Sequence, residues 1–192
     1  RQQIREELNL TASAGVAPNK FLAKIASDWC KPDGLFVIHP GEVKAFLLPL
    51  PVSRIPGVGK VTEARLKEMG IVTVGDLRDL GLEALVNEFG RYGHRLLELA
   101  NGIDHNPVVS NRPTKSISAE DTFERDLLLS ETEEPIRRLA EKVWAASRRE
   151  TRIPRTVVLK LKTSDFNIMT RSYTPPSPPS TCREFTAIAL AL

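Results

Sequence analysis

A short turn at residues 54–61, with the sequence RIPGVGKV, constrains this chain more than any other segment. Pro56 fixes one backbone angle, while Gly57 and Gly59 lack a Cβ, so both can adopt φ > 0 and permit the close approach of another backbone. The residues that follow, 60–69, are mostly helix formers. The sequence therefore predicts a tight turn that leads directly into a helix.

The first turn of that helix has the properties of an anion site. Its N–H groups, including those of Val61 and Thr62, lack partners within the helix, and the helix end carries a partial positive charge. The arrangement resembles the helix-hairpin-helix of DNA-repair and replication proteins, which holds a strand by its phosphates and reads no bases. An ordinary tight turn between two helices is the alternative. The predicted DNA-binding residues of this turn are Gly57, Val58, Gly59 and Lys60.

Composition permits a nucleic-acid partner without requiring one. The 192 residues carry a formal net charge of +3, an excess that a neutral-surfaced enzyme could also carry. The basic residues are unevenly placed, because residues 148–192 hold eight basic residues against three acidic ones. Hydrophobic residues make up 41% of the chain, which is enough for one or two packed cores.

The cysteines and the hydropathy indicate a reduced, soluble environment. Cys30 and Cys182 lie far apart without metal-ligand spacing, so we expect reduced thiols. No secretory leader and no long apolar span appears in the sequence. We therefore expect no membrane partner, and the cytoplasm is the default location.

The first 39 residues read as helix, strand, helix. Residues 1–8 are polar and helix-prone, residues 10–16 are small and partly β-branched, and a helix begins at Pro18 and runs to about Trp29. At 100° per residue, the apolar residues of this last helix fall within one arc. We expect that arc to face a core.

The lysines of the same helix fall on its opposite side. Lys20, Lys24 and, if the helix extends that far, Lys31 form a basic stripe, for which simple solvent exposure is the alternative. Residues 31–34, with the sequence KPDG, end the helix abruptly, because proline disfavours α geometry in the preceding residue and glycine permits a reversal. Lys31 is therefore predicted to lie at a corner.

Residues 40–104 predict a small helical bundle. Their apolar residues recur at helical spacing and are interrupted by glycines. A second, looser hairpin is predicted at residues 89–94, FGRYGH. A helix–helix turn with Tyr92 packed on the core is the alternative to a second phosphate contact. Residues 105–114 lose periodicity, carry two prolines and read as an extended tether.

The last region alternates strands and helices. Residues 115–123 are a strand candidate, Thr132 can cap a helix with Pro135 in its first turn, and residues 168–174 form a further strand before a proline-rich loop and a final helix. Residues 156–163 alternate strictly, with Val157, Leu159 and Leu161 on one face and Val158, Lys160 and Lys162 on the other. The order β-α-β-β-α fits an incomplete ferredoxin-like fold, so the expected class is α+β.

Several of these segments together carry a family resemblance. They are residues 14–28 (AGVAPNKFLAKIASD), 31–34 (KPDG), 55–60 (IPGVGK), 89–93 (FGRYG), 100–104 (ANGID) and 115–118 (KSIS). This set closely resembles the Y-family translesion DNA polymerases, specifically the bacterial DinB type. The resemblance covers nearly the whole chain.

The resemblance implies a domain organisation. Residues 1–39 correspond to the C-terminal part of the palm, 40–104 to a helical thumb with the helix-hairpin-helix, 105–114 to a linker, and 115–192 to an incomplete little finger. The family carries out nucleotidyl transfer with two Mg²⁺ ions held by carboxylates that lie upstream of the segment matched here. We therefore expect no catalytic carboxylate and no metal ligand in this chain, and no polymerase activity from the chain alone.

The resemblance also assigns residues and partners. Lys31 matches the family lysine that contacts the triphosphate of the incoming nucleotide. Lys115, Ser116, Ser118 and Arg171 match little-finger positions that touch the DNA backbone, and the strand alternation adds Lys162. The implied partners are primer–template DNA, a deoxynucleoside triphosphate and a sliding clamp, although the clamp-binding peptide usual at the extreme C terminus of the family is not among these residues.

Two other functional classes are also compatible with the hairpin. One is a non-catalytic DNA-binding accessory module that reuses a helix-hairpin-helix. The other, which fits the flanking segments less well, is the hairpin domain of a repair nuclease or ligase. Upstream sequence with an early aspartate in a hydrophobic strand and a Ser-x-Asp-Glu pair would identify the polymerase.

Overall fold

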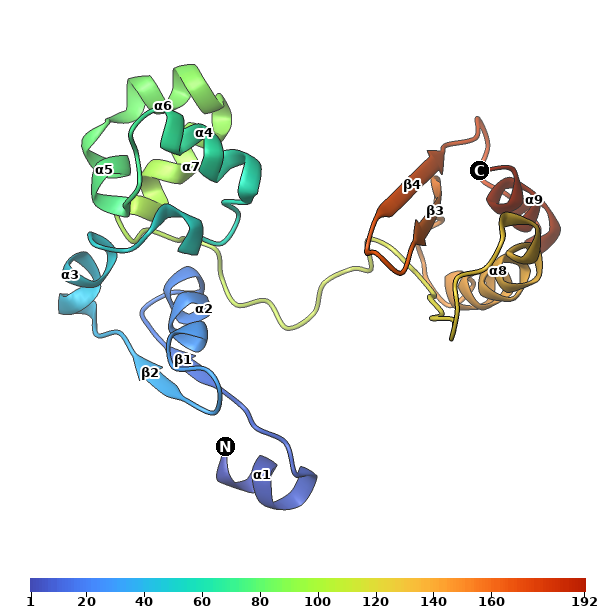
Figure 1. Ribbon diagram of the computed structural model, residues 1–192, viewed down its shortest axis with the longest axis horizontal. Helices are drawn as coiled ribbons and strands as arrows, with labels where there is room; N and C mark the ends of the chain where they lie inside the picture. The colour runs from blue at the N-terminus through green and yellow to red at the C-terminus, as the bar shows by residue number, and fades with distance from the viewer. The chain divides into compact units, whose positions relative to one another are not determined.

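A computed structural model describes all 192 residues, which form two compact units (Figure 1). The first unit is Arg1–Ser110 and the second is Asn111–Leu192. The division lies within residues 105–114, the segment expected to be a tether. Across both units, every helix is too short or too polar to cross a lipid bilayer.

The first unit begins with a small βαβ arrangement. Helix α1 (Gln2–Leu8) is followed by β1 (Ala14–Val16), α2 (Lys20–Trp29) and β2 (Leu35–Val37). The two strands pair in parallel, with Ala14 opposite Leu35, and α2 supplies the crossover that parallel strands need. The expected helix, strand and helix are confirmed, while β2 was not predicted.

Helix α2 buries the face that its periodicity indicates. Phe21, Leu22, Ile25 and Ala26 are buried, and Asn19 caps the helix by accepting a hydrogen bond from the N–H of Leu22 at 3.0 Å. At the other end, Trp29 packs edge-on against Phe46 with ring centroids 4.9 Å apart, and Phe36 lies against both rings. These aromatic contacts tie α2 to β2 and to the helices that follow.

The rest of the first unit is a bundle of short helices, as the glycine-interrupted apolar pattern predicts. It contains the 3₁₀ turns Pro40–Glu42 and Val52–Arg54 and the helices α3 (Val43–Leu47), α4 (Lys60–Glu68), α5 (Val74–Asp79), α6 (Leu82–Phe89) and α7 (Arg91–Ala100). None of these helices is long enough to be stable alone. Their stability comes from a shared core that includes Leu47, Leu50, Val52, Ile55, Leu66, Val74, Leu77, Leu85 and Leu96.

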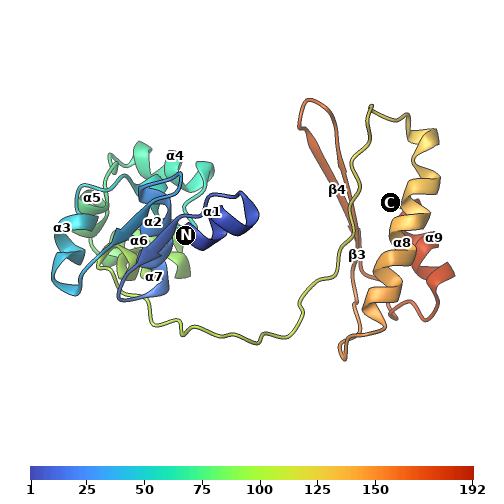
Figure 2. The same ribbon diagram turned by 90° about the horizontal axis from the view of Figure 1, so that it is seen from below.

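The second unit packs two helices on one face of a β-hairpin (Figure 2). A 3₁₀ turn (Leu129–Glu131) precedes α8 (Glu133–Ser147), β3 (Val157–Lys162), β4 (Ile168–Tyr173) and α9 (Cys182–Ala191). The strands are antiparallel, and Trp144 of α8 packs against Phe185 of α9 with ring centroids 6.2 Å apart. The mixed helix and strand content agrees with the expected α+β class.

The strand expected at residues 115–123 is not formed. This stretch makes no backbone hydrogen bonds with β3 or β4, so the ferredoxin-like order remains a prediction. Only Ile117 and Ala119 are partly buried here. A strand candidate in the sequence becomes a strand only where it finds a partner edge and enough buried apolar area to hold it there.

Candidate nucleic-acid interface

The turn before α4 is anchored by two buried side chains. Ile55 is 1% exposed and Val58 is 8% exposed, and the Val58 N–H donates to the Ile55 carbonyl at 2.9 Å. The Val58 N–H was predicted to contact a phosphate, but it already has an acceptor within the turn. Val58 therefore serves to hold the turn on the core.

The backbone N–H groups on either side of Val58 donate no hydrogen bond in the structure. The first hydrogen bond into α4 runs from Glu63 N to the Gly59 carbonyl at 2.9 Å, and no side chain caps this helix. Val61 is 85% exposed, so the first turn faces open space. The N–H groups that donate to no acceptor in the structure are those of Gly57, Gly59, Lys60, Val61 and Thr62.

The two glycines of the turn have different roles. Gly57 has φ = 104°, and a Cβ on it would lie 3.1 Å from the hydroxyl oxygen of Tyr92. Gly59 is the N-cap of α4, with φ = −88° and ψ = 176°, and a Cβ on it would meet nothing within 4 Å. The expected positive φ is therefore wrong for Gly59, because an N-cap residue takes extended geometry that any residue can adopt.

The second predicted hairpin lies between α6 and α7, with Gly90 at φ = 57°. The side chain of Tyr92 packs against the core of the first unit, as in the alternative interpretation of this segment. Its hydroxyl is buried without a hydrogen-bond partner. Burial raises the pKa of this phenol, with a smaller opposing effect from Arg95.

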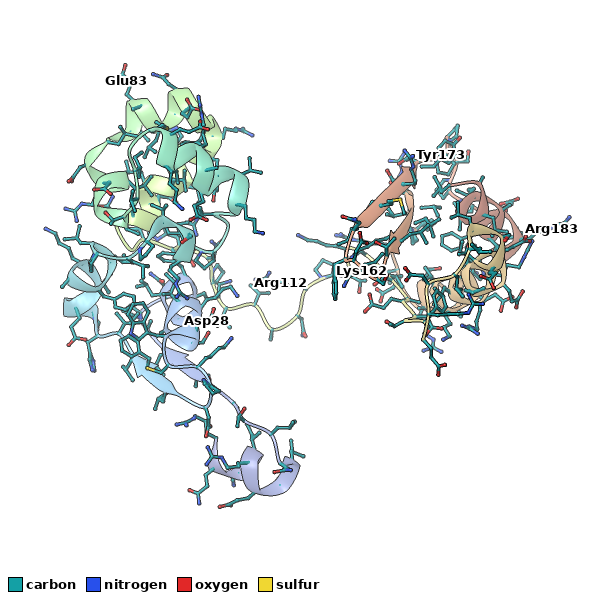
Figure 3. All side chains as sticks on the ribbon, viewed as in Figure 1. Asp28, Glu83, Arg112, Lys162, Tyr173 and Arg183 are labelled. Carbon is teal, nitrogen blue, oxygen red and sulfur yellow. The ribbon has the colours of Figure 1, made fainter.

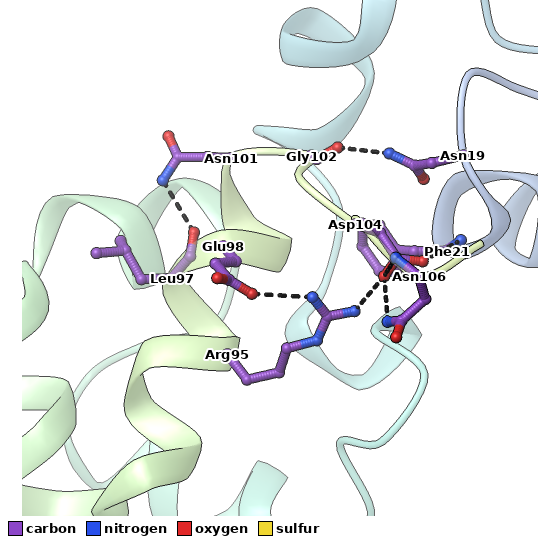
Figure 4. Close-up of polar contacts among 9 residues, drawn as sticks. All are labelled: Asn19, Phe21, Arg95, Leu97, Glu98, Asn101, Gly102, Asp104 and Asn106. Carbon is purple, nitrogen blue, oxygen red and sulfur yellow. Dashed lines mark hydrogen bonds and ion pairs between the residues drawn. The ribbon is translucent and has the colours of Figure 1, made fainter.

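A polar joint connects α2 to the end of α7 (Figure 4). The Asp104 carboxylate is 4% exposed and accepts hydrogen bonds from Arg95 Nη2 at 2.7 Å and from the Phe21 N–H at 3.3 Å. Asn106 adds its side-chain and backbone N–H groups. Asn19 Nδ2 donates to the Gly102 carbonyl at 2.8 Å.

This joint was not predicted from the sequence. The bonds from Asn19 and Phe21 each span 83 residues, and no local pattern indicates such a pairing. Burial alone would raise the pKa of the Asp104 carboxyl, but the donors from Arg95 and Asn106 outweigh it and hold that pKa below its usual value. The joint is therefore an ionised, hydrogen-bonded contact.

A hollow of about 350 Å³ lies between α2, the first hairpin and α7. Its walls therefore come from segments far apart in the sequence. The lining residues are Lys20, Phe21, Lys24, Pro56, Gly57, Tyr92, Arg95, Leu99 and Asp104.

Lys31 lies at the predicted corner after α2 and forms an ion pair with Asp28. The Lys31 side chain is 60% exposed, and its hydrogen bond and charge lower the pKa of the Asp28 carboxyl. Asp33, in the same corner, pairs with Arg1 and Arg5. Both carboxylates near the corner are thus engaged by cations.

These carboxylates do not fit a catalytic metal pair, which needs clustered, free carboxylates. The structure holds no group of three or more His, Cys, Asp or Glu residues placed to bind a metal ion. No residue of this chain is therefore assigned to Mg²⁺.

The β3 strand of the second unit presents its lysines outward, as its alternation predicts. Val157 is buried and Leu159 partly buried, while Lys160 and Lys162 are exposed. Lys162 Nζ lies 4.0 Å from the centre of the Phe166 ring, a cation–π contact that leaves the charge at the surface. Figure 3 shows Lys162 on this unit. Lys115, Ser116 and Ser118 are also exposed.

Arg171 does not share the lysine face. It lies directly opposite Leu159, whereas Lys160 lies opposite Thr170 and Lys162 opposite Ile168. Residues directly opposite in an antiparallel pair point to the same side of the sheet. The register of the β3–β4 hairpin therefore places Arg171 and Lys162 on opposite faces, so a single face of this hairpin does not present both side chains to DNA.

Three family models match the chain. Residues 1–28 match the impB/mucB/samB family, residues 53–104 match the thumb domain described as DNA polymerase-iota, and residues 114–192 match the impB/mucB/samB family C-terminal domain. The matches therefore lie in both structural units.

The curated relatives that match this chain are named DNA polymerase IV. The chain is 61% identical over 192 residues to DNA polymerase IV of Xanthomonas campestris pv. campestris (strain 8004), which covers 100% of this chain and 54% of that protein. It is 51% identical over 174 residues to DNA polymerase IV of Neisseria meningitidis serogroup A / serotype 4A, covering 91% of this chain and 49% of that protein. The chain spans about half the length of the curated relatives it matches.

Solved structures agree with the sequence matches. A Y-family DNA polymerase chimera of Dbh and Dpo4 superposes with a TM-score of 0.75 at 29% identity, covering 100% of this chain and 55% of that one. An insertion ternary complex of Dbh DNA polymerase gives a TM-score of 0.57 at 26% identity, with 100% and 55% covered. With family models, curated relatives and solved structures in agreement, this chain belongs to the Y-family DNA polymerases of the DinB type and corresponds to their C-terminal part.

Proposed function

We propose that this chain is the DNA-binding part of a DNA-directed DNA polymerase for translesion synthesis and that it grips primer–template DNA by its phosphates. The observation that carries the proposal is the free first turn of α4. Its N–H groups lack acceptors, it is exposed, and it lies in the segment that matches a polymerase thumb domain. Backbone N–H groups at a helix N-terminus bind phosphate without reading bases, which suits an enzyme that copies any template.

In this proposal the first unit contains the end of the palm (1–39) and the thumb (40–104). Residues 105–114 are the linker, and residues 115–192 are the incomplete little finger. Lys115, Ser116, Ser118 and Lys162 contact the DNA backbone from the little finger. Their exposure supports this role.

Lys31 contacts the triphosphate of the incoming nucleotide in the intact protein. Its ion pair with Asp28 is exposed at both ends, and an exposed pair contributes little free energy. A triphosphate can therefore replace Asp28 as the partner of Lys31. Mg²⁺, the deoxynucleotide and a sliding clamp are partners of the intact polymerase, which acts in the cytoplasm.

The accessory-module hypothesis shares the hairpin but not the rest of the chain. The curated match extends over all 192 residues, on both sides of the hairpin, and the family models cover segments in both units. These matches favour the polymerase over a module that reuses the hairpin alone.

The test measures DNA binding by the chain and its variants at several salt concentrations. Binding is detected by the fluorescence anisotropy of a labelled primer–template duplex. Gly59→Val fits the extended backbone and open surroundings of this residue, so the fold should persist. The added side chain would block a phosphate from the free N–H groups, and we expect affinity to fall by roughly 10- to 100-fold. Lys60→Ala, which leaves those donors in place, should cost less.

Gly41→Val is the matched control, because a Cβ there also meets nothing within 4 Å. If Gly59→Val binds DNA normally and Lys60→Ala loses most of the affinity, the result would contradict phosphate binding by the backbone N–H groups and would indicate a basic patch. In the same assay, Lys115→Ala and Lys162→Ala should each lower the slope of log K against log salt by about 0.9 for all sequences. Arg171→Ala, on the other face of the β3–β4 hairpin, should leave that slope unchanged.

A further inference from the structure

The hollow between α2 and the first hairpin has no role in the function proposed above. It lies within the first unit and measures about 350 Å³, near the lower end of the range for ligand pockets, which is about 300–1,000 Å³. One wall is the first half of α2, and another is the hairpin itself through Pro56 and Gly57. The hollow therefore adjoins the backbone N–H groups that are proposed to bind a phosphate at the start of α4.

The lining of the hollow carries a positive charge. It includes three basic side chains, Lys20, Lys24 and Arg95, against one carboxylate, Asp104. Arg95 pairs with Asp104 at 2.7 Å and also with Glu98 at 2.9 Å, and Glu98 does not line the hollow. Two uncompensated lysines remain.

Neither lysine has a counter-ion. Lys20 and Lys24 take part in no ion pair within 4.0 Å and donate no side-chain hydrogen bond in the structure. Asp28 lies one turn after Lys24 on the same helix, but its carboxylate forms an ion pair with Lys31. Both ammonium groups are therefore free to bind an anion that enters the hollow.

The joint keeps these lysines beside the hairpin. The bonds from the Phe21 N–H to Asp104 and from Asn19 to the Gly102 carbonyl hold the first turn of α2 against the end of the helical bundle. Lys20 and Lys24 are four residues apart, so they lie on the same face of α2. Gly57 lines the hollow and also contributes a free N–H to the hairpin.

We propose that the hollow binds a second backbone phosphate of the same DNA strand, held by Lys20 and Lys24, next to the phosphate bound by the hairpin. A DNA strand presents phosphates at regular intervals, so a strand that meets the hairpin brings a neighbouring phosphate to the adjoining surface. This inference rests on the proposed function, because it needs the hairpin to bind a strand. A free nucleoside triphosphate is the other source of the same chemistry.

The experiment measures the salt dependence of DNA binding for Lys20→Ala and Lys24→Ala in the full chain. Each variant should lower the slope of log K against log salt by about 0.9 and weaken binding by roughly fivefold to tenfold at 0.1 M salt. Lys24→Arg, which keeps the charge, should retain the parent slope. Lys44→Ala is the control, since Lys44 is also exposed on α3, has no ion pair and does not line the hollow.

Slopes for Lys20→Ala and Lys24→Ala equal to that of Lys44→Ala would overturn the inference. If Gly59→Val still weakens binding in that case, the hairpin function stands and only the second phosphate is wrong. If the parent chain itself shows no salt-dependent DNA binding, both proposals fail.

A titration with dATP in the absence of DNA separates the two sources of phosphate. We expect Lys24→Ala and the parent to bind dATP equally weakly. A loss of dATP affinity in Lys24→Ala, combined with an unchanged salt slope for DNA, would assign the hollow to the nucleotide and overturn the strand assignment.

Discussion

At the scale of single residues, the contact between Gly57 and Tyr92 connects the two hairpins. The φ of Gly57 is one that L side chains rarely adopt, and a Cβ on this residue would lie only 3.1 Å from the Tyr92 hydroxyl, so a side chain there would be strained. Gly59, two residues on, has neither constraint. One glycine is therefore required by the fold, while the other is available for a ligand.

The buried hydroxyl of Tyr92 predicts that Tyr92→Phe stabilises the first unit. The hydroxyl has no partner, and a buried polar group without a hydrogen bond costs about 1–3 kcal/mol. We expect a gain of about 1 kcal/mol in the free energy of unfolding. Urea unfolding followed by Trp29 fluorescence in a Trp144→Phe background measures this unit alone.

Tyr173→Phe is the control for that substitution, because Tyr173 is 48% exposed in the second unit. It should leave the unfolding of the first unit unchanged. Destabilisation by Tyr92→Phe would mean that the hydroxyl has a partner, such as a bound water, and would contradict the prediction.

At the scale of elements, the joint fixes how α2 meets the helical bundle. Asp104 receives donors from α2, from α7 through Arg95, and from the start of the tether through Asn106. A charge-assisted hydrogen bond to a carboxylate stabilises by about 1.5–3 kcal/mol. The position of α2, and of the lysines on it, therefore depends on one buried carboxylate.

We predict that Asp104→Asn destabilises the first unit by about 2 kcal/mol at neutral pH. The pKa of the Asp104 carboxyl is lower in the folded state than its ordinary value of 3.8. Its contribution is therefore fully present above that ordinary value and is lost as pH falls through the lower folded value. The stability difference between parent and variant should be constant above about pH 5 and shrink below about pH 4.

Urea unfolding at several pH values, again followed by Trp29 fluorescence, checks this prediction. Asp79→Asn is the matched control, since Asp79 is exposed on α5 and has no ion pair. A difference between parent and Asp104→Asn that does not change with pH would show that the ionised carboxylate is not what stabilises the joint.

At the scale of the whole molecule, the two units carry separate parts of the proposed DNA grip. The first has the hairpin, the hollow and the Lys31 corner, and the second has the lysine face of β3. Each unit has its own buried apolar residues, which include Leu66 in the first and Val157 in the second. We therefore expect phosphate contacts from the two units to add in the salt dependence of binding.

The whole chain should bind DNA without extending a primer. Nucleotidyl transfer by two metal ions needs clustered carboxylates, and Asp28 and Asp33 are engaged by cations. A primer-extension assay with Mg²⁺ and deoxynucleotides should give no product at protein concentrations where anisotropy shows the duplex bound. Template-dependent incorporation by the purified chain, free of any contaminating polymerase, would defeat this prediction.

Local sequence determined those parts of the fold that depend on neighbouring residues. The apolar arc of α2, the corner at residues 31–34, the turn before α4 and the alternation of β3 all appear as predicted. In each case the periodicity or the backbone preference of a few consecutive residues decides the conformation. The same alternation located the exposed side chains of Lys160 and Lys162, whereas the roles proposed for Lys31 and Lys115 rest on the family resemblance.

Tertiary structure decided which of those residues meet. The pairing of β2, the approach of Tyr92 to Gly57 and the joint at Asp104 all join segments far apart in the chain. The face of Arg171 depends on the register of a hairpin, and a shift of one residue would reverse it. Residues 115–123 are a strand candidate in the sequence, yet they make no backbone hydrogen bonds with β3 or β4. Such outcomes depend on non-local contacts, which no local pattern specifies.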